Sequence, residues 1–286
     1  MERYYRFAGI ELSVVMPEEK FYEHEQRLKP FVVGSVKHPY VYSVEMVDVL
    51  EEPIGTCVAM YPNFRVYQEE GQRIRYIGAV EKSLDGAYIR VSDSERENVI
   101  QVLNKNHPGR IMPKIILKSI ELEHLIAQNQ GFILHCSYIE RDGKAILFTA
   151  PSETGKSTQA DLWNQLRGTK IINGDRAAVR IVDGQIFAEG IPFAGSSQYC
   201  ENRSLPIDAI VYLGQALQTT IRKIEGYQAF MKIWEGVSVN SWDKKDVEQV
   251  SNVVSKVVQG VPIFHLTCTP DESAIIALED ALNKKG

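Results

Sequence analysis

The order of hydrophobic and polar positions predicts a first third of the chain dominated by strands. Runs of β-branched and aromatic residues favour strands, and Glu69-Glu70-Gly71 interrupts one run in a way that predicts a hairpin. Two stretches rich in charged residues favour helices. The elements expected here are strands at 4–16, 64–77 and 87–91 and helices at 18–28 and 94–103.

The remainder alternates strand-like and helix-like patterns. Asp142-Gly143 and Asp183-Gly184 each lie between two strand-like runs, which predicts hairpins because both turn positions require a positive φ. The expected order is helix 114–128, hairpin 132–140 with 144–149, helix 156–167, strand 170–173, hairpin 177–182 with 185–189, strand 207–213, helices 226–237 and 247–257, strand 261–266, and a last helix opened by a capping box at Thr269. The Pro- and Gly-containing segment 106–110 predicts a boundary between domains 1–107 and 108–286.

One segment of the second domain carries a recognisable chemistry. An apolar run at 145–149 enters a turn-forming stretch, which ends in Gly155-Lys156-Ser157-Thr158 before a helix-compatible run. Strand, loop, Gly-Lys-Ser and helix in this order predict a phosphate-binding loop, because backbone N–H groups and the helix dipole favour an anion there. We therefore expect ATP and Mg²⁺ as cofactors, with nucleotide contacts from Ser152, Thr154, Gly155, Lys156, Ser157 and Thr158.

An alternative reading of this segment remains open. The tripeptide alone is weak evidence, since average residue usage gives it by chance in about one chain in seven of this length. The strict pattern begins with Gly where this chain has Ala150. Under the alternative, a buried strand leads into an ordinary helix and Lys156 is merely solvated.

Several residues outside the loop are candidates for phosphoryl-transfer chemistry. Asp175 ends the strand after the predicted helix, so it can return beside the loop as a metal ligand, or it can be a turn aspartate. His135 precedes the loop by one hairpin and can lie near the loop's base, or be an ordinary sheet histidine. Glu189 is a second carboxylate that can reach metal, and Arg176 and Arg203 can neutralise phosphoryl charge.

Composition and charge exclude several other classes of function. The net charge of −5, the pI near 5.8 and the scattered basic residues argue against nucleic acid or an anionic membrane as the main partner. No apolar run reaches the length of a membrane span, and the N-terminus lacks a secretory pattern. Cys57, Cys136, Cys200 and Cys268 are widely spaced, which predicts reduced thiols in a cytoplasmic protein.

The motifs also match a known family. The matching segments are HCSYIERDGKAILFTAPSETGKST from His135, then IINGDRAAVRIVDG, EGIPFAG, LPIDAIVYLG and the ending VPIFHLTCTPDESAIIAL. In these segments the chain resembles the HPr kinase/phosphorylase-related serine kinases of the phosphoenolpyruvate-carboxykinase-like P-loop superfamily. The resemblance implies an α/β fold with a mixed-sheet P-loop kinase domain, which a small α+β domain would precede.

The resemblance also implies an activity and site residues. Such relatives phosphorylate a hydroxyl, usually serine, of a protein or peptide, and some act on free serine. Carried over by position, the catalytic residues would be Lys156, Asp175 and His135, and the metal ligands Ser157, Asp175 and Glu189. Glu153 is a further catalytic candidate that does not come from the family pattern. We expect a nucleotide and a peptide, protein or small hydroxyl acceptor as partners, with a homo-oligomer left open.

Two departures from the family pattern put catalysis in question. The family usually has Gly where this chain has Glu153, and Asp, its presumed general base, where this chain has Gly174. One hypothesis is that the carboxylate has moved from position 174 to Glu153 and that Gly174 leaves space there. Under the alternative, Glu153 merely faces solvent. The alternative function is a catalytically inactive nucleotide-binding adaptor for a peptide or protein.

Overall fold

The chain divides into two compact units, Met1–Glu121 and Leu122–Gly286. The computed structural model describes residues 1–17, 27–69, 71–80, 82–94, 96–105, 113–193, 195, 197 and 199–284. The division after Glu121 lies further along the chain than the expected boundary at 107, because helix α1 (Pro113–Ser119) belongs to the first unit. The segment 106–110 that suggested the boundary lies outside the described residues.

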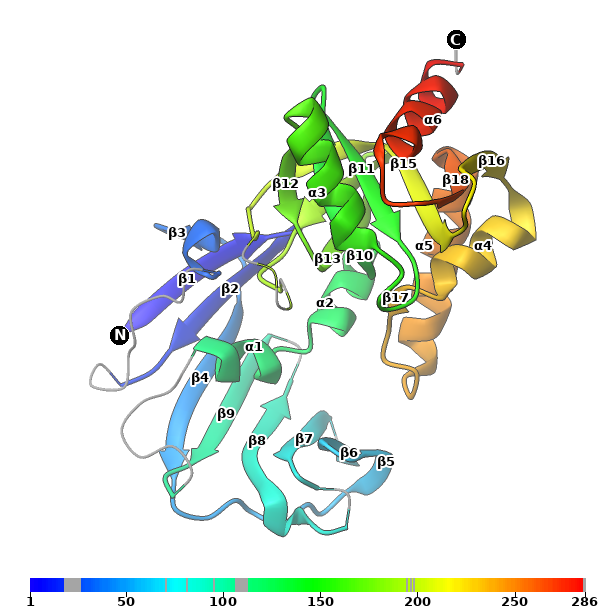
Figure 1. Ribbon diagram of the computed structural model, residues 1–286. Helices are drawn as coiled ribbons and strands as arrows, with labels where there is room; N and C mark the ends of the chain where they lie inside the picture. Colours follow the sequence, from blue (N-terminus) through cyan, green and yellow to red (C-terminus); the bar gives the residue numbers. More distant parts are fainter. Residues whose placement is uncertain are drawn as a thin grey trace. The chain divides into compact units, whose positions relative to one another are not determined.

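The first unit is built on a mixed sheet, whose nine described strands run in the order β3-β1-β2-β4-β9-β8-β7-β6-β5 (Figure 1). The pairs β2–β4 and β4–β9 are parallel. The predicted hairpin at 64–77 is confirmed as β6–β7. The strands are β1 Glu2–Phe7, β2 Ile10–Val15, β3 Val32–Val33, β4 Tyr40–Val47, β5 Thr56–Tyr61, β6 Phe64–Glu69, β7 Gln72–Gly78, β8 Ala87–Asp93 and β9 Glu97–Leu103, with 3-10 turns η2 Lys29–Phe31 and η3 Leu84–Gly86.

The helix predicted at 94–103 is wrong, because this segment forms strand β9 between β4 and β8. Its side chains alternate: Asn98, Ile100 and Val102 are buried, while Val99 and Gln101 are partly exposed. A period of two residues is that of a strand with one buried face. A helix was predicted because the charged residues before the strand made this two-residue alternation hard to recognise in the sequence. The helix predicted at 18–28 lies almost entirely outside the described residues.

The second unit has its own mixed sheet, in which strands of both directions meet. The hairpins around Asp142-Gly143 and Asp183-Gly184 are confirmed as β10–β11 and β13–β14, and φ is positive at all four turn residues. The pairs β11–β15 and β15–β18 are parallel, so their carboxyl ends lie at one edge of the sheet. The strands are β10 Gly131–Arg141, β11 Lys144–Thr149, β12 Lys170–Asn173, β13 Arg176–Val182, β14 Gln185–Gly190, β15 Ser204–Gln215, β16 Thr220–Ile224, β17 Val237–Ser238 and β18 Ile263–Cys268.

Strand β10 changes partners halfway along its length. Residues 131–135 pair with β13, and residues 133–134 also pair with β17. Residues 136–141 pair with β11, and residues 138–140 also pair with β12. His135 is therefore the last residue of β10 that pairs with β13, and Cys136 is the first that pairs with β11. Because the change occurs next to the end of β11, it brings His135 close to the segment that follows β11.

Helices cover both faces of the second sheet. Ile146 and Phe148 pack with residues of α3 and α6 in one core cluster, whereas Ala145 and Leu147 pack with residues of α4 and α5 in another. This division follows from the alternation of side chains along β11. Figure 1 shows α3 and α6 on the same side of the sheet. The helices are α2 Leu122–Gln128, α3 Lys156–Arg167, α4 Gly226–Trp234, α5 Lys244–Gly260 and α6 Glu272–Asn283.

Two helix predictions need correction. The helix expected at 114–128 is broken after Ser119, whose carbonyl oxygen accepts a hydrogen bond at 2.5 Å from the Arg75 guanidinium. The last helix is capped by Asp271, which accepts from the Ser273 N–H at 2.8 Å, and not by Thr269. No helix in the described part of the chain is long and apolar enough to cross a lipid bilayer.

Candidate functional site

The segment between β11 and α3, here called the 150–155 loop, has a left-handed backbone at two positions. Glu153 has a φ of 64° and Gly155 a φ of 107°. Gly155 immediately precedes the first turn of α3. A Cβ added to Gly155 would meet nothing within 4 Å, so the residue there is constrained by φ and not by space. Left-handed residues beside a helix start are typical of backbone nests that bind anions.

The Lys156 side chain folds back over this loop. Its ammonium Nζ donates hydrogen bonds of 3.1 Å to the carbonyl oxygens of Ala150 and Pro151, and the residue is 7% exposed. Burial lowers the pKa of Lys156, while the negative charge of Asp175 acts in the opposite direction. Among the contacts described, the ammonium is thus paired only with carbonyl oxygens. A neutral carbonyl is a weaker partner for a buried cation than an anion is.

Asp175 is positioned by the turn that begins at Asn173. The Asn173 Oδ1 accepts hydrogen bonds from the N–H groups of Asp175 (2.9 Å) and Arg176 (3.0 Å). The Asp175 carboxylate lies 3.4 Å from His135 Nε2 and 3.4 Å from Arg176 Nε. The hydrogen bond from His135, followed by the charge of Arg176, lowers the pKa of Asp175 despite its partial burial.

His135 is fixed at the point where β10 changes partners. Its N–H donates to the Gly236 carbonyl at 2.8 Å, and its carbonyl accepts from the Thr149 hydroxyl at 3.0 Å. Its imidazole remains 34% exposed and faces Asp175. The expectation that a histidine one hairpin earlier lies near the base of the loop therefore matches its position.

These groups surround one cavity of about 710 Å³, here called the loop cavity. The predicted residues His135, Ser152, Glu153, Gly155, Lys156, Ser157, Thr158 and Asp175 line it, together with Ala160, Asp161, Ile171, Gly174, Ser197 and Tyr199. Thr154 lies in the same loop, and its hydroxyl is 3.5 Å from the Ser152 carbonyl. The cavity combines a helix N-terminus, a cation, several hydroxyls, a histidine and the three carboxylates of Glu153, Asp161 and Asp175. Hydroxyl and carboxylate oxygens are the ligands that Mg²⁺ prefers.

Glu189 and Arg203, which the sequence made candidates, lie elsewhere. Glu189 is 8% exposed and pairs with Arg180 at 2.9 Å, and it also accepts from the Ser204 hydroxyl. Arg203 pairs with Glu140 at 2.5 Å. Neither residue is among those that line the loop cavity, so the expectation that Glu189 reaches a metal there does not match its position. The strand-end pattern alone could not reveal the competing arginine.

The expectation that Gly174 leaves free space is wrong. A Cβ at Gly174 would lie 2.2 Å from the Ser197 hydroxyl oxygen and 2.6 Å from its Cβ. A Cβ at Gly195 would likewise lie 2.7 Å from the Asp175 carboxyl carbon. Ser197 therefore packs directly on Gly174, and Gly195 on Asp175.

Sequence reasoning missed Asn173, the residue that organises this part of the site. It is fully buried, and its Nδ2 donates to the carbonyls of Ile191 (3.1 Å) and Phe193 (2.9 Å). One side chain thus fixes both the turn to Asp175 and the start of the segment over Gly174. The Asn-Gly-Asp sequence is a signal for such a turn, because asparagine side chains bond to backbone groups two residues on. Its tertiary contacts have no local signal.

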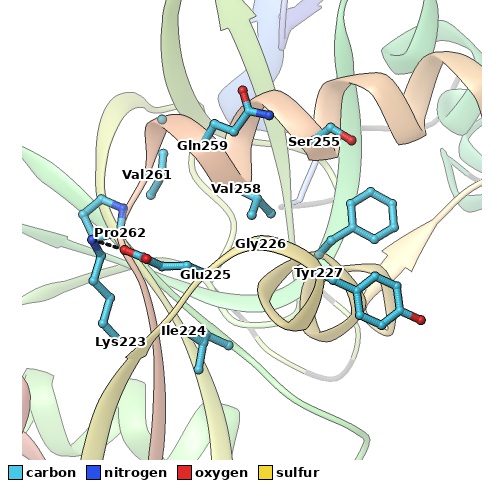
Figure 2. Close-up of a pocket in the computed structure, with 12 residues that line it drawn as sticks. Lys223, Ile224, Glu225, Gly226, Tyr227, Ser255, Val258, Gln259, Val261 and Pro262 are labelled. Atoms are coloured by element: carbon cyan, nitrogen blue, oxygen red, sulfur yellow. Dashed lines mark ion pairs between the residues drawn. The ribbon is translucent and has the colours of Figure 1, made fainter.

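A second hollow of the same unit, the α4–α5 hollow, has a different character. It measures about 580 Å³ and is lined by the β16–α4 turn and the end of α5 (Figure 2). Its lining is largely apolar, with Tyr227 79% exposed at its rim. Its two charged residues, Lys223 and Glu225, pair with each other at 2.6 Å. Nothing in this lining points to phosphate chemistry.

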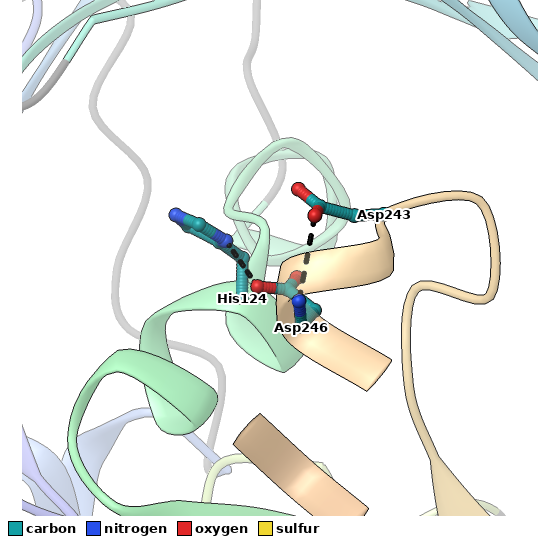
Figure 3. Close-up of side chains that lie close together, drawn as sticks. All are labelled: His124, Asp243 and Asp246. Carbon is teal, nitrogen blue, oxygen red and sulfur yellow. Dashed lines mark hydrogen bonds and ion pairs between the residues drawn. The ribbon is translucent and has the colours of Figure 1, made fainter. Parts of the chain in front are cut away.

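A polar cluster joins α2 to the start of α5 (Figure 3). His124 Nδ1 lies 2.8 Å from one oxygen of the fully buried Asp246 carboxylate, and Asn240 donates to the other at 3.2 Å. Asp243 caps α5 through the N–H of Lys245 at 2.9 Å. The donor atoms of His124, Asp243 and Asp246 lie within 4.8 Å of one another. Since both Asp246 oxygens are already engaged, we interpret the cluster as a structural contact between two helices.

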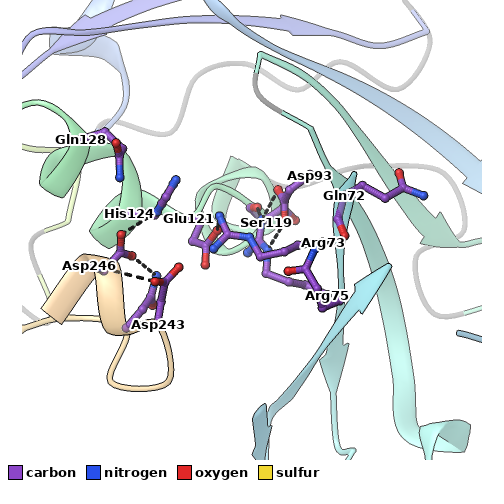
Figure 4. A network of polar contacts seen from close by, with 12 residues as sticks. Gln72, Arg73, Arg75, Asp93, Ser119, Glu121, His124, Gln128, Asp243 and Asp246 are labelled. Carbon is purple, nitrogen blue, oxygen red and sulfur yellow. Dashed lines mark hydrogen bonds and ion pairs between the residues drawn. The ribbon is translucent and has the colours of Figure 1, made fainter. Parts of the chain in front are cut away.

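The first unit contains a buried ion pair of its own. The Arg75 guanidinium bonds to Asp93 through two nitrogens, at 2.5 and 2.8 Å, and to the Ser119 carbonyl (Figure 4). All these groups are satisfied by one another. The Arg75–Asp93 ion pair therefore explains why α1 ends at Ser119, and its polar groups are not free to bind a ligand.

Comparison with known proteins adds one distant likeness. No family model matches the chain, and none of the curated proteins matches it in sequence. Among solved structures, one match is the structure of the Hpr(Ser) kinase/phosphatase from Coxiella burnetii. It is 10% identical over 54% of this chain and 99% of that chain, with a TM-score of 0.34. This is a distant structural likeness to a kinase.

Proposed function

We propose that this chain is an ATP-dependent kinase that transfers the γ-phosphoryl group to a hydroxyl, that of serine or threonine in a peptide or protein. The observation that carries the proposal is the loop cavity itself. Lys156, Ser157 and Asp175 come from two separate elements and line the same cavity at the N-terminus of α3. Phosphoryl transfer requires such positioned charges more than it requires covalent chemistry from the protein.

Each residue of the cavity has a role in this proposal. The α3 N–H groups without intrahelical acceptors would bind phosphate oxygens. Lys156 would exchange its two carbonyl partners for phosphate, which is a stronger partner for a cation. Ser157 and Asp175 would hold Mg²⁺, which would neutralise phosphate charge during transfer. His135 would orient the Asp175 carboxylate through their contact.

The transfer needs a group that takes the acceptor's proton. The acceptor oxygen bonds to the γ-phosphorus as the bond from that phosphorus to the β-bridging oxygen breaks, and the hydroxyl proton must leave. Glu153 lines the loop cavity and its side chain is exposed, so it can take that proton. Gly174 cannot do so, and the adjacent Ser197 has no carboxylate. Of the other carboxylates in the lining, Asp175 is engaged with His135 and Arg176, and Asp161 lies in the second turn of α3. We assign the base to Glu153, which lies in the 150–155 loop itself.

A kinase assay with a matched control tests the proposal. Wild-type protein with Mg-ATP and a serine-containing peptide library should yield peptides heavier by one phosphoryl group, detected by mass spectrometry. Lys156→Ala should abolish this product. Lys144→Ala should not, because Lys144 is 58% exposed at the opposite end of β11. Equal products from both variants would contradict the assignment.

The absence of a carboxylate at Gly174 favours a second function, a nucleotide-binding adaptor without catalysis. The adaptor would bind ATP through the same loop and present a peptide or protein partner. It predicts Mg-ATP binding that depends on Lys156, with no phosphorylated product from any hydroxyl acceptor. The same two variants thus distinguish the two functions.

A further inference from the structure

A third hollow, of about 450 Å³, lies on the other flank of the 150–155 loop and is here called the β15–β18 hollow. Three segments line it: the loop with the first turn of α3, residues 213–217 at the end of β15, and residues 268–270 after β18. The two strands are parallel, so the hollow lies at their carboxyl edge. Ligands of open α/β sheets bind at that edge.

The two cavities share part of their lining but differ in charge. Glu153, Gly155 and Thr158 line both. Lys156 and Asp175 line only the loop cavity, and Glu153 is the one charged residue in the lining of the β15–β18 hollow. One side of the loop is therefore suited to phosphate and metal, and the other to a neutral group.

The order of residues along α3 gives the ligand a direction. A lysine at the position of Lys156 reaches the β- and γ-phosphates, and the backbone N–H groups of the loop before it face the α- and β-phosphates. Three residues of that loop, Glu153, Thr154 and Gly155, line the β15–β18 hollow. Lys156 and Ser157 lie on the side of the loop cavity, while Thr158 and Gln159 lead to the β15–β18 hollow. A nucleotide with its γ-phosphate at Lys156 would therefore extend its sugar and base over Thr158 into the hollow.

A buried side-chain amide in this hollow has an oxygen atom without a hydrogen-bond partner among the described residues. Gln159 is 3% exposed, and its Nε2 is 3.4 Å from the Cys268 sulfur. Its Oε1 has no hydrogen-bond partner among the described residues. Buried side-chain polar atoms are normally paired, and an unpaired one needs an explanation. A ligand that offers a donor and an acceptor side by side would use both ends of this carboxamide.

The rest of the lining suits a flat apolar ring. Leu213 is buried at the base of the hollow, and Leu217 is 95% exposed at its edge. The side chain of Gln215 reaches the Glu153 carbonyl at 3.5 Å, which connects the end of β15 to the loop. A ring between these segments would cover Leu217 from water.

We propose that the β15–β18 hollow seats the base of an adenine nucleotide and that Gln159 reads its amino group. Adenine carries its amino donor next to a ring-nitrogen acceptor, which matches a glutamine carboxamide with two hydrogen bonds. This inference rests on the proposed function, because it requires the triphosphate to lie at Lys156. To the proposed function it adds the place where the base binds and the identity of that base, adenine.

The test compares three ligands by calorimetry with Mg²⁺: ATP, the triphosphate of purine riboside, which lacks the amino group, and inorganic tripolyphosphate. Wild-type protein should bind ATP about tenfold more tightly than the purine riboside analogue, the effect of one hydrogen bond to a buried group. It should bind tripolyphosphate more weakly than either. Gln159→Leu should remove the difference between ATP and the analogue, whereas Gln165→Leu, at an exposed position of the same helix, should keep it.

Leu217→Glu provides a second variant that does not disturb the core, because Leu217 is exposed. It should weaken ATP binding and leave tripolyphosphate binding unchanged. If tripolyphosphate binds as tightly as ATP, or if Leu217→Glu leaves their affinity ratio as it was, this inference is overturned and the proposed function stands. If none of the three ligands binds, both are overturned together.

Discussion

Replacing Glu153 with glycine should stabilise the protein, because the backbone at this position favours glycine. A non-glycine residue in the left-handed region costs about 1–2 kcal/mol, and Glu153 has a φ of 64°. Glycine offsets part of this gain through its greater freedom in the unfolded chain, about 0.5–1 kcal/mol. The expected net gain for Glu153→Gly is about 0.5–1 kcal/mol, or a rise in Tm of about 1–3 °C for a chain of this size.

Two variants separate the backbone from the charge. Glu153→Gln keeps the left-handed backbone and removes the negative charge, so its stability should remain that of the wild type. Asp183→Gly relieves a φ of 49° in the β13–β14 turn, away from the loop. Its gain should be no larger than that of Glu153→Gly, because aspartate tolerates this region better than glutamate. Urea and thermal unfolding measure all three. A Glu153→Gly protein less stable than wild type would refute the strain argument.

The same variants test Glu153 as the base. A positioned general base contributes about 10²–10⁴-fold to a rate, so Glu153→Gln should lower kcat by at least about a hundredfold while nucleotide affinity is kept. Glu153→Gly should show the same loss, although it is the more stable protein. If Glu153→Gln had the kcat of the wild type, Glu153 could not be the base that replaces a carboxylate at position 174.

Three further predictions concern the surroundings of the site. Gly174→Ala should destabilise the protein by about 1–3 kcal/mol, because its Cβ would meet the Ser197 hydroxyl at 2.2 Å, and urea unfolding should show this. Asp175 has a lowered pKa through His135, so its stabilising contribution should be present above its ordinary pKa of 3.8 and be lost as the pH falls through the lower folded value. Unfolding of Asp175→Asn should lack this acid-dependent loss, and an unchanged pH profile would contradict it. Asp246→Ala should cost about 1–3 kcal/mol in urea unfolding, because it removes two hydrogen bonds of a buried carboxylate, and a neutral effect would show that the cluster is not structural.

Local signals were sufficient for much of the second unit. The Asp-Gly turns, the strand before the loop and the helix after it were predicted because each depends on residues adjacent in sequence. Strand β16 was missed, because its five residues TIRKI have only one buried position. The cap of the last helix was predicted at Thr269 but lies at Asp271. Both residue types can cap a helix, and only the backbone geometry decides between them.

The candidate site could be predicted only in part, because its geometry depends on distant segments. The meeting of His135 and Asp175 follows from the pairing of β10 with β13, which sets His135 opposite Arg176 and which no local pattern revealed. The packing of Ser197 on Gly174 joins residues that no spacing rule connects. The pairing of Glu189 with Arg180 is different, because the two residues are diagonal neighbours in the β13–β14 hairpin, and only the choice of partner was missed. Such contacts are set by the tertiary fold, so sequence patterns identify the candidates but not their partners.

The central claim is that the 150–155 loop and the start of α3 bind the phosphates of a nucleotide through Lys156. Calorimetric titration of wild-type protein, Lys156→Ala and Lys144→Ala with Mg-ADP tests it most directly. The account predicts saturable binding by wild type and by Lys144→Ala, and an affinity at least about tenfold lower for Lys156→Ala, the loss of one charge-assisted contact. No measurable binding by the wild type, or equal affinities for all three proteins, would contradict it.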